Sequence, residues 1–383
     1  MITRKIRFYP NKQQKKLFEK CFNAHRYFYN KSIAQLKFES LTKKKLSLTL
    51  PSLRNKVMHT DTELEPNELW QKEIPFDTRQ LAIKEAIGSY KSSIQLIKNK
   101  QIKHFTHNFK RKKDNIQTFH VDKKAFRNNK IFIQRLGKTK SVIYLRKKNK
   151  KLLQEFLPNG IENDFKIQRT NTDKYYLILS KSVEKEQNEK EYKQIALDPG
   201  VRTFQTGYSP EGIILESGKR ELNKIRLLHD LIDRLQSLRT KGIKGIVKRI
   251  HNLHEKCVNI TNNLHRQVVS FLTKNFNEVY LPSFNTKKML IREDRKIGSG
   301  TAREMQILSF YRFKQLLKCV AIRRNTKVFI VSEKYTTKTC GNCGNMKDIG
   351  SCEVYGCQTC QVSLPRDINA ARNIFMKNLL LDQ

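Results

Sequence analysis

Two pairs of cysteines near the C-terminal end have the spacing of a zinc site. Cys340 and Cys343 form one C-x2-C pair, Cys357 and Cys360 form another, and thirteen residues separate the pairs. Each pair on a tight turn can place two thiolates on one side of a zinc ion, so two pairs complete a closed tetrahedron. We therefore expect a structural Zn²⁺ at these four sulfurs. Cys352 is a spare thiol, and its pairing with Cys357 remains open as a less regular alternative.

Three acidic residues stand where buried strands end or a helix begins. Asp198 ends the run Ile195–Leu197, Glu333 follows the run Val328–Val331, and Asp367 lies at the start of the last helical pattern. Carboxylates brought together suit Mg²⁺, which prefers oxygen ligands. Two such ions can activate water and stabilise the leaving oxygen in phosphodiester hydrolysis. The alternative is ordinary surface charge, or helix capping in the case of Asp367.

The charge balance points to a polyanionic partner. The chain has 383 residues, with 77 Lys and Arg against 35 Asp and Glu, which gives a formal net charge of +42. Such an excess repels itself in a compact fold unless nucleic acid or another polyanion neutralises it. A membrane surface is the alternative, but no apolar run is long enough to span a bilayer, and we expect no membrane partner. The first residues lack the apolar core of a signal peptide, so an intracellular protein is expected.

One basic segment is interleaved with aromatic residues, a combination that suits a nucleic-acid strand because cations meet phosphates and rings stack on bases. The alternatives are a solvated basic loop and a nuclear-import signal at Lys110–Lys113. The residues that we expect to contact nucleic acid are Lys103, Phe105, Phe109, Lys110, Arg111, Lys112 and Lys113.

The elements that must position these residues form a multidomain α/β pattern. Residues 1–10 and 101–182 carry strand-like runs, among them 131–133, 142–145 and a hairpin over 165–179, which predict a β-barrel or curled sheet. Residues 11–100 show two apolar helix stripes and predict an inserted helical domain. Residues 183–192 are charged and predict a linker. Strands alternate with helices over 193–335 and 363–383, and the zinc ribbon occupies 336–362.

Three further cysteines lie outside the zinc motif. Cys21, Cys257 and Cys319 fall in apolar helical patterns, where packing in the core is the expected role.

Several stretches resemble the TnpB and Fanzor nucleases, which are transposon-encoded relatives of the type V CRISPR effectors. The resemblance runs in order across nearly the whole chain. It is strongest in LDPGVRTFQTGY (197–208), LPSFNTKKM (281–289), YRFKQLLK (311–318), EKYTTKTCGNCG (333–344) and RDINAARNIF (366–375), and weaker in residues 6–30 and 109–119.

The resemblance implies a RuvC-like nuclease domain of RNase H fold with an inserted zinc ribbon, and a β-barrel wedge domain interrupted by a helical recognition domain. It also implies a transposon-derived guide RNA that pairs with one strand of a double-stranded DNA target. Asp198 and Asp367 match two catalytic acids. Where many TnpB proteins carry the remaining Glu, this chain has Pro282, which cannot bind metal. Glu333 matches the relocated Glu of the Fanzor branch, so that branch is the preferred placement.

The leading functional prediction is therefore an RNA-guided, Mg²⁺-dependent DNA endonuclease with Asp198, Glu333 and Asp367 as its metal ligands. A catalytically inactive RNA-guided DNA-binding regulator is the alternative, with Pro282 as its support. A DNA-strand transferase ranks low, because no Tyr or Ser nucleophile context is evident. The expected compartment is the nucleus for a eukaryotic or viral protein and the cytoplasm for a bacterial one.

Overall fold

The computed structural model describes residues 1–42, 44–59, 64–186, 189–291, 297–350 and 352–379. The chain divides into two compact units, Met1–Val183 and Glu184–Gln383. The boundary falls within the charged segment 183–192.

An antiparallel sheet organises the first unit. Its four strands pair in the order β1-β6-β5-β2. Ile6 pairs with Leu177 across β1 and β6, and both side chains are buried, as alternation in the sequence predicts. The strands of this unit are β1 (Ile2–Phe8), β2 (Ile116–Val121), β3 (Phe126–Arg127), β4 (Lys130–Ile131), β5 (Phe165–Thr170) and β6 (Tyr175–Lys181). In the described residues, β1, β6, β5 and β2 pair as an open sheet, and β3 pairs with β4 separately. The predicted barrel stays a prediction.

One long helix joins this sheet to a helical layer. Helix α1 begins after Asn11, whose side chain and that of Gln14 form a reciprocal capping box. Phe18 and Phe22 of α1 pack in the core of the sheet, whereas Phe28 and Ile33 pack in a second core with α2 and α3. The helices of this unit are α1 (Lys12–Leu41), α2 (Leu50–Val57), η1 (Pro66–Glu73), α3 (Phe76–Lys98), η2 (Lys123–Ala125), α4 (Ile133–Lys140) and α5 (Lys147–Phe156).

Two predicted strands of this unit do not form over their predicted ranges. In the run 131–133, only Ile131 belongs to a strand, β4, whereas Phe132 adopts a left-handed backbone (φ 50°) and Ile133 begins α4. In the run 142–145, only isolated bridges form, at Val142 and Tyr144. The hairpin over 165–179 is confirmed by β5 and β6, with Asp173 at positive φ in its turn. Apolar runs of three or four residues cannot by themselves distinguish a strand from a loop that fills a core.

A mixed sheet organises the second unit, in the order β11-β10-β7-β8-β9. Strands β7, β8 and β9 pair antiparallel, whereas β10 and β11 run parallel to β7. The sheet is therefore mixed, as the predicted alternation of strands and helices allows. The strands are β7 (Tyr192–Pro199), β8 (Gln205–Tyr208), β9 (Ile214–Ser217), β10 (Phe276–Pro282), β11 (Lys327–Val331), β12 (Val354–Gly356) and β13 (Ser363–Pro365).

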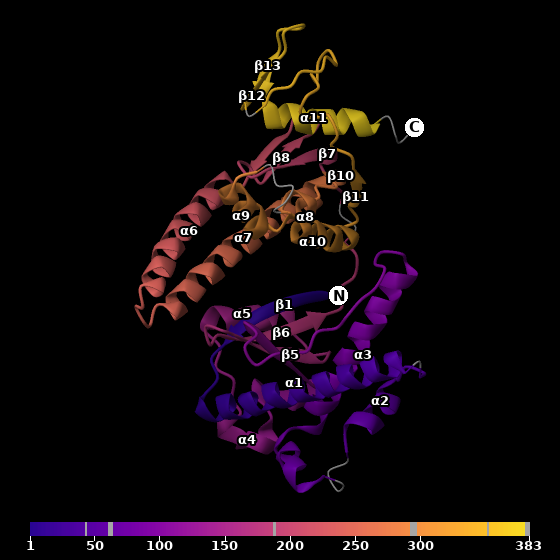
Figure 1. Cartoon of the computed structure of the whole chain (residues 1–383), viewed down its shortest axis with the longest axis vertical. Helices are drawn as coiled ribbons and strands as arrows, with labels where there is room; N and C mark the ends of the chain where they lie inside the picture. The colour runs from indigo at the N-terminus through magenta and orange to yellow at the C-terminus, as the bar shows by residue number, and fades with distance from the viewer. Residues whose placement is uncertain (43, 60–63, 187–188, 292–296, 351, 380–383) are drawn as a thin grey trace. The chain divides into compact units, whose positions relative to one another are not determined.

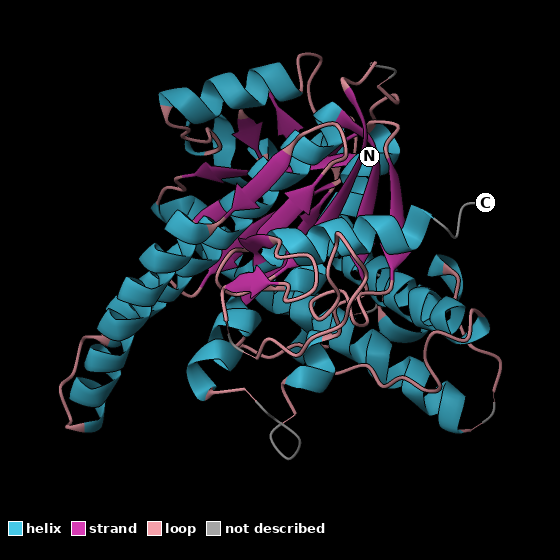
Figure 2. Cartoon of the chain, turned by 90° about the horizontal axis from the view of Figure 1, so that it is seen from above, coloured by secondary structure: helices cyan, strands magenta, loops and turns pink. Residues whose placement is uncertain are grey.

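Helices cover both faces of this sheet (Figure 1). Ile195 and Leu197 of β7 pack with α7 and α10 on one face. Ala196 packs with Ile374 of α11 on the other. The α6–α7 pair extends past the sheet as a hairpin with its own apolar contacts (Figure 2). The helices are α6 (Lys219–Thr240), α7 (Val247–Asn275), α8 (Thr286–Met289), α9 (Ser299–Leu308), α10 (Phe310–Arg323) and α11 (Arg366–Leu379).

The described part of the predicted linker is attached to the second unit. Glu186 forms ion pairs with Arg323 and Arg324, and Lys190 donates a hydrogen bond to the carbonyl of Asn325. Both contacts lie at the end of α10, so these charged side chains bind neighbouring residues of the second unit. None of the helices in the described ranges combines the length and apolar character that a membrane crossing needs.

Candidate functional site

Asp198 lies near the end of the central strand of the second unit. The three residues before it in β7 are fully buried, and Asp198 itself is partly buried. It pairs with Thr206 of β8 across the antiparallel part of the sheet. The carboxyl group of Asp198 therefore lies at the end of a central strand, where a ligand can reach it.

Glu333 and Asp367 approach from two other elements. Glu333 follows β11 by two residues and is partly buried. Asp367 is in the first turn of α11, where its Oδ1 lies 3.5 Å from Nε of Arg366. Helix α11 packs against β7, the strand that carries Asp198.

Electrostatic interactions connect the three carboxylates. Burial, together with the negative charges of Asp367 and Glu333, raises the pKa of Asp198 to about 8, and Arg366 opposes part of the effect. Burial also raises the pKa of Glu333. The three ligand oxygens do not all lie within 4.8 Å of one another in the described residues. Carboxylates with too few cations beside them fit hard divalent cations such as Mg²⁺. Two such ions would lie about 4 Å apart, so their carboxylate ligands need not all be in contact with one another.

The four predicted zinc ligands meet in one cluster. Sγ of Cys340 lies 3.6 Å from Sγ of Cys360, and Sγ of Cys343 lies 3.5 Å from that of Cys357. All four sulfurs lie within 4.8 Å of one another. Cys352 is not in this group, which favours the regular pairing of the two motifs. Four thiols and no other donor make a closed zinc site, since Zn²⁺ prefers tetrahedral sulfur ligands.

Two asparagines attach the zinc cluster to the helix that carries Asp367. Asn369 accepts a hydrogen bond from the backbone N–H of Gly341 and donates one to the carbonyl of Thr339. Asn373 donates to the carbonyls of Thr336 and Thr339. Both asparagines are buried on α11. Sequence reasoning missed them, although their spacing of four residues on a helix was a usable signal.

The three isolated cysteines do not all lie in the core. Cys21 and Cys257 are buried, as predicted, but Cys319 is exposed. Helix α10 buries Phe313 and Leu317 instead, so the prediction for Cys319 is wrong. Its position in an apolar sequence did not fix which face of the helix it occupies.

The basic segment 103–113 divides into inward and outward residues. Phe105 packs edge-on against Tyr90, with ring centroids 5.4 Å apart. Nζ of Lys110 lies 4.0 Å from the ring centroid of Tyr29 and also pairs with Glu85. These two residues therefore have a structural role within the first unit. The others lie on the surface, namely Lys103, Phe109, Arg111, Lys112 and Lys113.

A second cluster of possible ligands surrounds Glu85. His25, Glu85 and His120 place their ligand atoms within 4.8 Å of one another, and the two imidazoles stack with centroids 5.4 Å apart. Two lysines already neutralise this carboxylate, because Lys110 and Lys166 lie within 2.5 and 3.9 Å of its oxygens. Burial and the charge of Lys110 lower the pKa of His25 well below its ordinary value. An added cation would meet two resident positive charges, so we interpret this cluster as a structural ion network.

Comparison with known protein families identifies two segments. Residues 310–374 match the family described as "Cas12f1-like, TNB domain", a range that includes Glu333, the zinc cysteines and Asp367. Residues 1–39 match a family described as "Helix-turn-helix domain" of the IS605 type. In this structure those residues form strand β1 and most of the single helix α1, without a turn between two helices.

Viral proteins are similar along almost the full chain. "TnpB-like protein L79" of Acanthamoeba polyphaga mimivirus is 27% identical over 98% of this chain and 73% of its own length. "Putative transposase A625R" of Paramecium bursaria Chlorella virus 1 is 28% identical over 98% of this chain and 86% of its own length. The chain is thus similar to TnpB-like proteins in sequence.

A solved structure supports the same fold. The protein in "Cryo-EM structure of the Cas12f1-sgRNA-target DNA complex" aligns with 95% of this chain and 83% of its own, with a TM-score of 0.54 and 15% identity. At this identity the match shows the fold alone, which is a mixed α/β architecture like that of Cas12f1.

Proposed function

We propose that this chain is an RNA-guided, Mg²⁺-dependent DNA endonuclease that uses a transposon-derived guide RNA. The observation that carries the proposal is the position of Asp198 at the end of the buried strand β7, within electrostatic range of both Asp367 and Glu333, whose charges add to burial in raising its pKa. Residues more than 130 positions apart in the sequence thus act on one carboxyl group. The three carboxylates suit a divalent metal ion. The net charge of +42 suits a polyanionic partner.

Asp198, Glu333 and Asp367 are the proposed ligands of the catalytic cations. Divalent cations held there would supply the activated water and the stabilisation of the leaving oxygen in phosphodiester hydrolysis. The raised pKa of Asp198 favours the neutral carboxylic acid at pH 7. Asp198 must therefore lose this proton when it binds a metal ion as a carboxylate. Arg366 lies beside Asp367, where it limits the mutual repulsion of the carboxylates.

The proposed partners are a guide RNA and a double-stranded DNA target. The solved Cas12f1 structure is a complex of that protein with an sgRNA and a target DNA, and two relatives from viruses carry the names TnpB-like protein and putative transposase. The net charge of +42 supports a long nucleic-acid interface. We place the chain near the Fanzor branch, because Pro282 ends β10 and Glu333 offers the replacement acid on the adjacent strand β11.

The alternative is an RNA-guided DNA-binding regulator without nuclease activity. Pro282 favours it, since this residue occupies the position where many TnpB proteins carry an acid. The electrostatic contribution of Glu333 to Asp198 favours the nuclease.

One assay separates the two. The protein is purified with its RNA and incubated with matched DNA and Mg²⁺, beside Asp198→Ala and the control Glu278→Gln. Glu278 is also an acid of this sheet, on β10, but its carboxylate accepts a hydrogen bond from the side chain of Gln194 and is not a proposed metal ligand. Cleavage by the wild type and the control but not by Asp198→Ala supports the nuclease. Binding to matched DNA without cleavage by any of the three proteins selects the regulator.

A further inference from the structure

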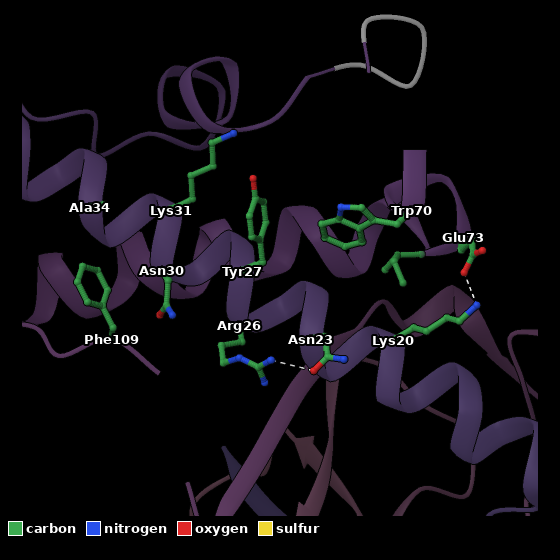
Figure 3. Close-up of a pocket in the computed structure, with 11 residues that line it drawn as sticks. Lys20, Asn23, Arg26, Tyr27, Asn30, Lys31, Ala34, Trp70, Glu73 and Phe109 are labelled. Atoms are coloured by element: carbon green, nitrogen blue, oxygen red, sulfur yellow. Dashed lines mark hydrogen bonds and ion pairs between the residues drawn. The ribbon is translucent and has the colours of Figure 1, made fainter. Parts of the chain in front are cut away.

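A groove runs along the outward face of α1 in the first unit, against η1 and the segment that carries Phe109. Its volume is about 910 Å³. Lys20, Asn23, Tyr27 and Ala34 line it at spacings of three, four and seven residues, which places them on one face of the helix. Trp70 of η1 lines the groove beside them (Figure 3).

Three large aromatic side chains in this groove are unusually accessible. Tyr27 is 39% exposed, Trp70 is 38% exposed and Phe109 is 48% exposed. The rings of Tyr27 and Trp70 meet edge to face, with centroids 5.4 Å apart and planes at 89°. Phe28 lies under Trp70 with its centroid at 6.4 Å, which anchors the indole from the core side. The groove therefore offers preordered aromatic faces at little conformational cost.

Cations accompany the aromatic rings. Figure 3 shows Lys31 and Tyr27 projecting from α1 in the same direction, and Nζ of Lys31 lies 5.7 Å from the ring centroid of Tyr27. Arg26 donates a hydrogen bond to Asn23 inside the groove. Lys37 lies 4.7 Å from the ring centroid of Phe109. The one carboxylate that lines the groove, on Glu73, is paired with Lys20.

The polar groups separate into structural and available ones. The side-chain amide of Asn30 is fully used, because it donates to the carbonyl of Lys110 and accepts from its N–H. This pair of hydrogen bonds fixes the segment that carries Phe109. Arg26 donates a hydrogen bond to Asn23, and Nζ of Lys31 lies 3.9 Å from Oε1 of Glu68. Arg26 and Lys31 are both partly exposed, so their charges can still face a ligand while the aromatic rings contact it.

We propose that this groove binds unpaired nucleotides of the RNA partner, with bases against Tyr27, Trp70 and Phe109 and phosphates near Arg26 and Lys31. The inference rests on the proposed function, because it takes RNA as the resident partner. Aromatic faces with a cationic rim suit bases that have left a stack, whereas the bases of a duplex are covered by their neighbours. RNA is the favoured source because loops and bulges of a structured RNA leave bases unpaired.

The structure supplies its own reporter, since Trp70 is the only tryptophan in the chain. The full-length protein is stripped of RNA in high salt, and its co-purified RNA is then titrated back. A gel shift measures RNA binding. Trp70 is excited at the red edge of its absorption band, where tyrosine does not absorb, and its emission is recorded. The expected result is quenching of Trp70 that saturates together with the gel shift. A thymidine oligodeoxynucleotide added afterwards should cause no further change.

Matched variants test the assignment of the groove. Tyr27→Ala and Phe109→Ala are expected to weaken RNA binding about fivefold or more, because each removes one stacking surface. Phe38→Ala is the control, since Phe38 is also on α1, is 52% exposed and lies outside the groove. Its affinity should stay within about twofold of the wild type. Circular dichroism of each variant checks that α1 is intact.

The outcomes separate the inference from the proposed function. If no RNA co-purifies or rebinds, the proposed function itself fails. If RNA rebinds while Trp70 emission stays constant, or if Tyr27→Ala binds like Phe38→Ala, the groove is not an RNA site. If Trp70 responds only when single-stranded DNA is added to the RNA-bound protein, the groove belongs to DNA and the assignment to RNA is overturned.

Discussion

Glu333 lies close enough to Asp198 to add, after burial and Asp367, to the rise in the pKa of Asp198, although Asp198 is in β7 and Glu333 follows β11, which is not a neighbour of β7. Strand β10 lies between β7 and β11, and it ends in Pro282, which pairs in register with Val331. We propose that Glu333, two positions past the end of the outer strand, supplies the acid that the middle strand lacks.

This relationship predicts a rescue. Glu333→Ala should reduce Mg²⁺-dependent cleavage about 100-fold or more, because a metal ligand is lost while nucleic-acid binding remains. Adding Pro282→Glu to that variant should restore cleavage at least about tenfold, since it returns a carboxylate to the adjacent strand end. Cleavage rates under single-turnover conditions measure both effects. Full activity of Glu333→Ala would remove this residue from the site.

The raised pKa of Asp198 predicts a pH-dependent stability. Between about pH 4 and about pH 8 the folded protein binds a proton that the unfolded chain has released, so the free energy of unfolding falls as pH rises through this window. Asp198→Asn lacks this titration. In buffer without Mg²⁺ and with zinc retained, it should become more stable than the wild type as pH approaches 8, by a few kcal/mol at most. Thermal unfolding of both proteins across this range is the measurement, and parallel curves would contradict the prediction.

The zinc cluster predicts a selective loss of metal. Cys343→Ser should lower the zinc content well below one ion per chain, because a closed site of four thiolates loses a ligand. Cys352→Ser is the matched control, since Cys352 lies outside the cluster, and it should keep its zinc. Elemental analysis of the purified proteins measures this. Because Asn369 and Asn373 attach the cluster to α11, zinc loss should also reduce cleavage. Zinc loss from Cys352→Ser as well would show that Cys352 is a ligand.

The ion network of the first unit predicts a large effect of one acid. Glu85→Ala should lower the free energy of unfolding by about 2 kcal/mol or more, because Lys110, the buried imidazole of His25 and the partly buried imidazole of His120 lose their common partner. Glu155→Ala, at a surface pair with Lys151, should cost less than about 1 kcal/mol. Denaturant unfolding compares the two.

The same network has a defined pH dependence. Burial alone would raise the pKa of Glu85, but the adjacent imidazoles of His120 and His25 and the ammonium of Lys110 lower it below its ordinary value. A lowered pKa stabilises the fold above the ordinary value of 4.5, and this contribution is lost as pH falls below it. The difference between wild type and Glu85→Ala should therefore shrink in acid. A constant difference down to about pH 3 would argue against an ionised Glu85.

The sequence determined the features that depend on short spacing or on a repeated pattern. The two C-x2-C motifs identified all four members of the sulfur cluster, because two residues between cysteines suffice to place both thiols on one turn. Alternation over longer runs predicted the β5–β6 hairpin, and the buried run before Asp198 predicted β7. The charge excess follows from composition alone.

Only the tertiary structure decided which distant residues share a location. Residues 131–133 were too short a run to show that Phe132 turns left-handed, and Cys319 could not reveal which face of α10 meets the core. Lys110, a predicted nucleic-acid contact, also pairs with Glu85 on a preceding helix, which its local sequence could not show. The groove of Tyr27, Trp70 and Phe109 joins three separate segments, and no local pattern encodes such a surface. Local propensities set strands and helices, whereas contacts between them arise from packing over the whole unit.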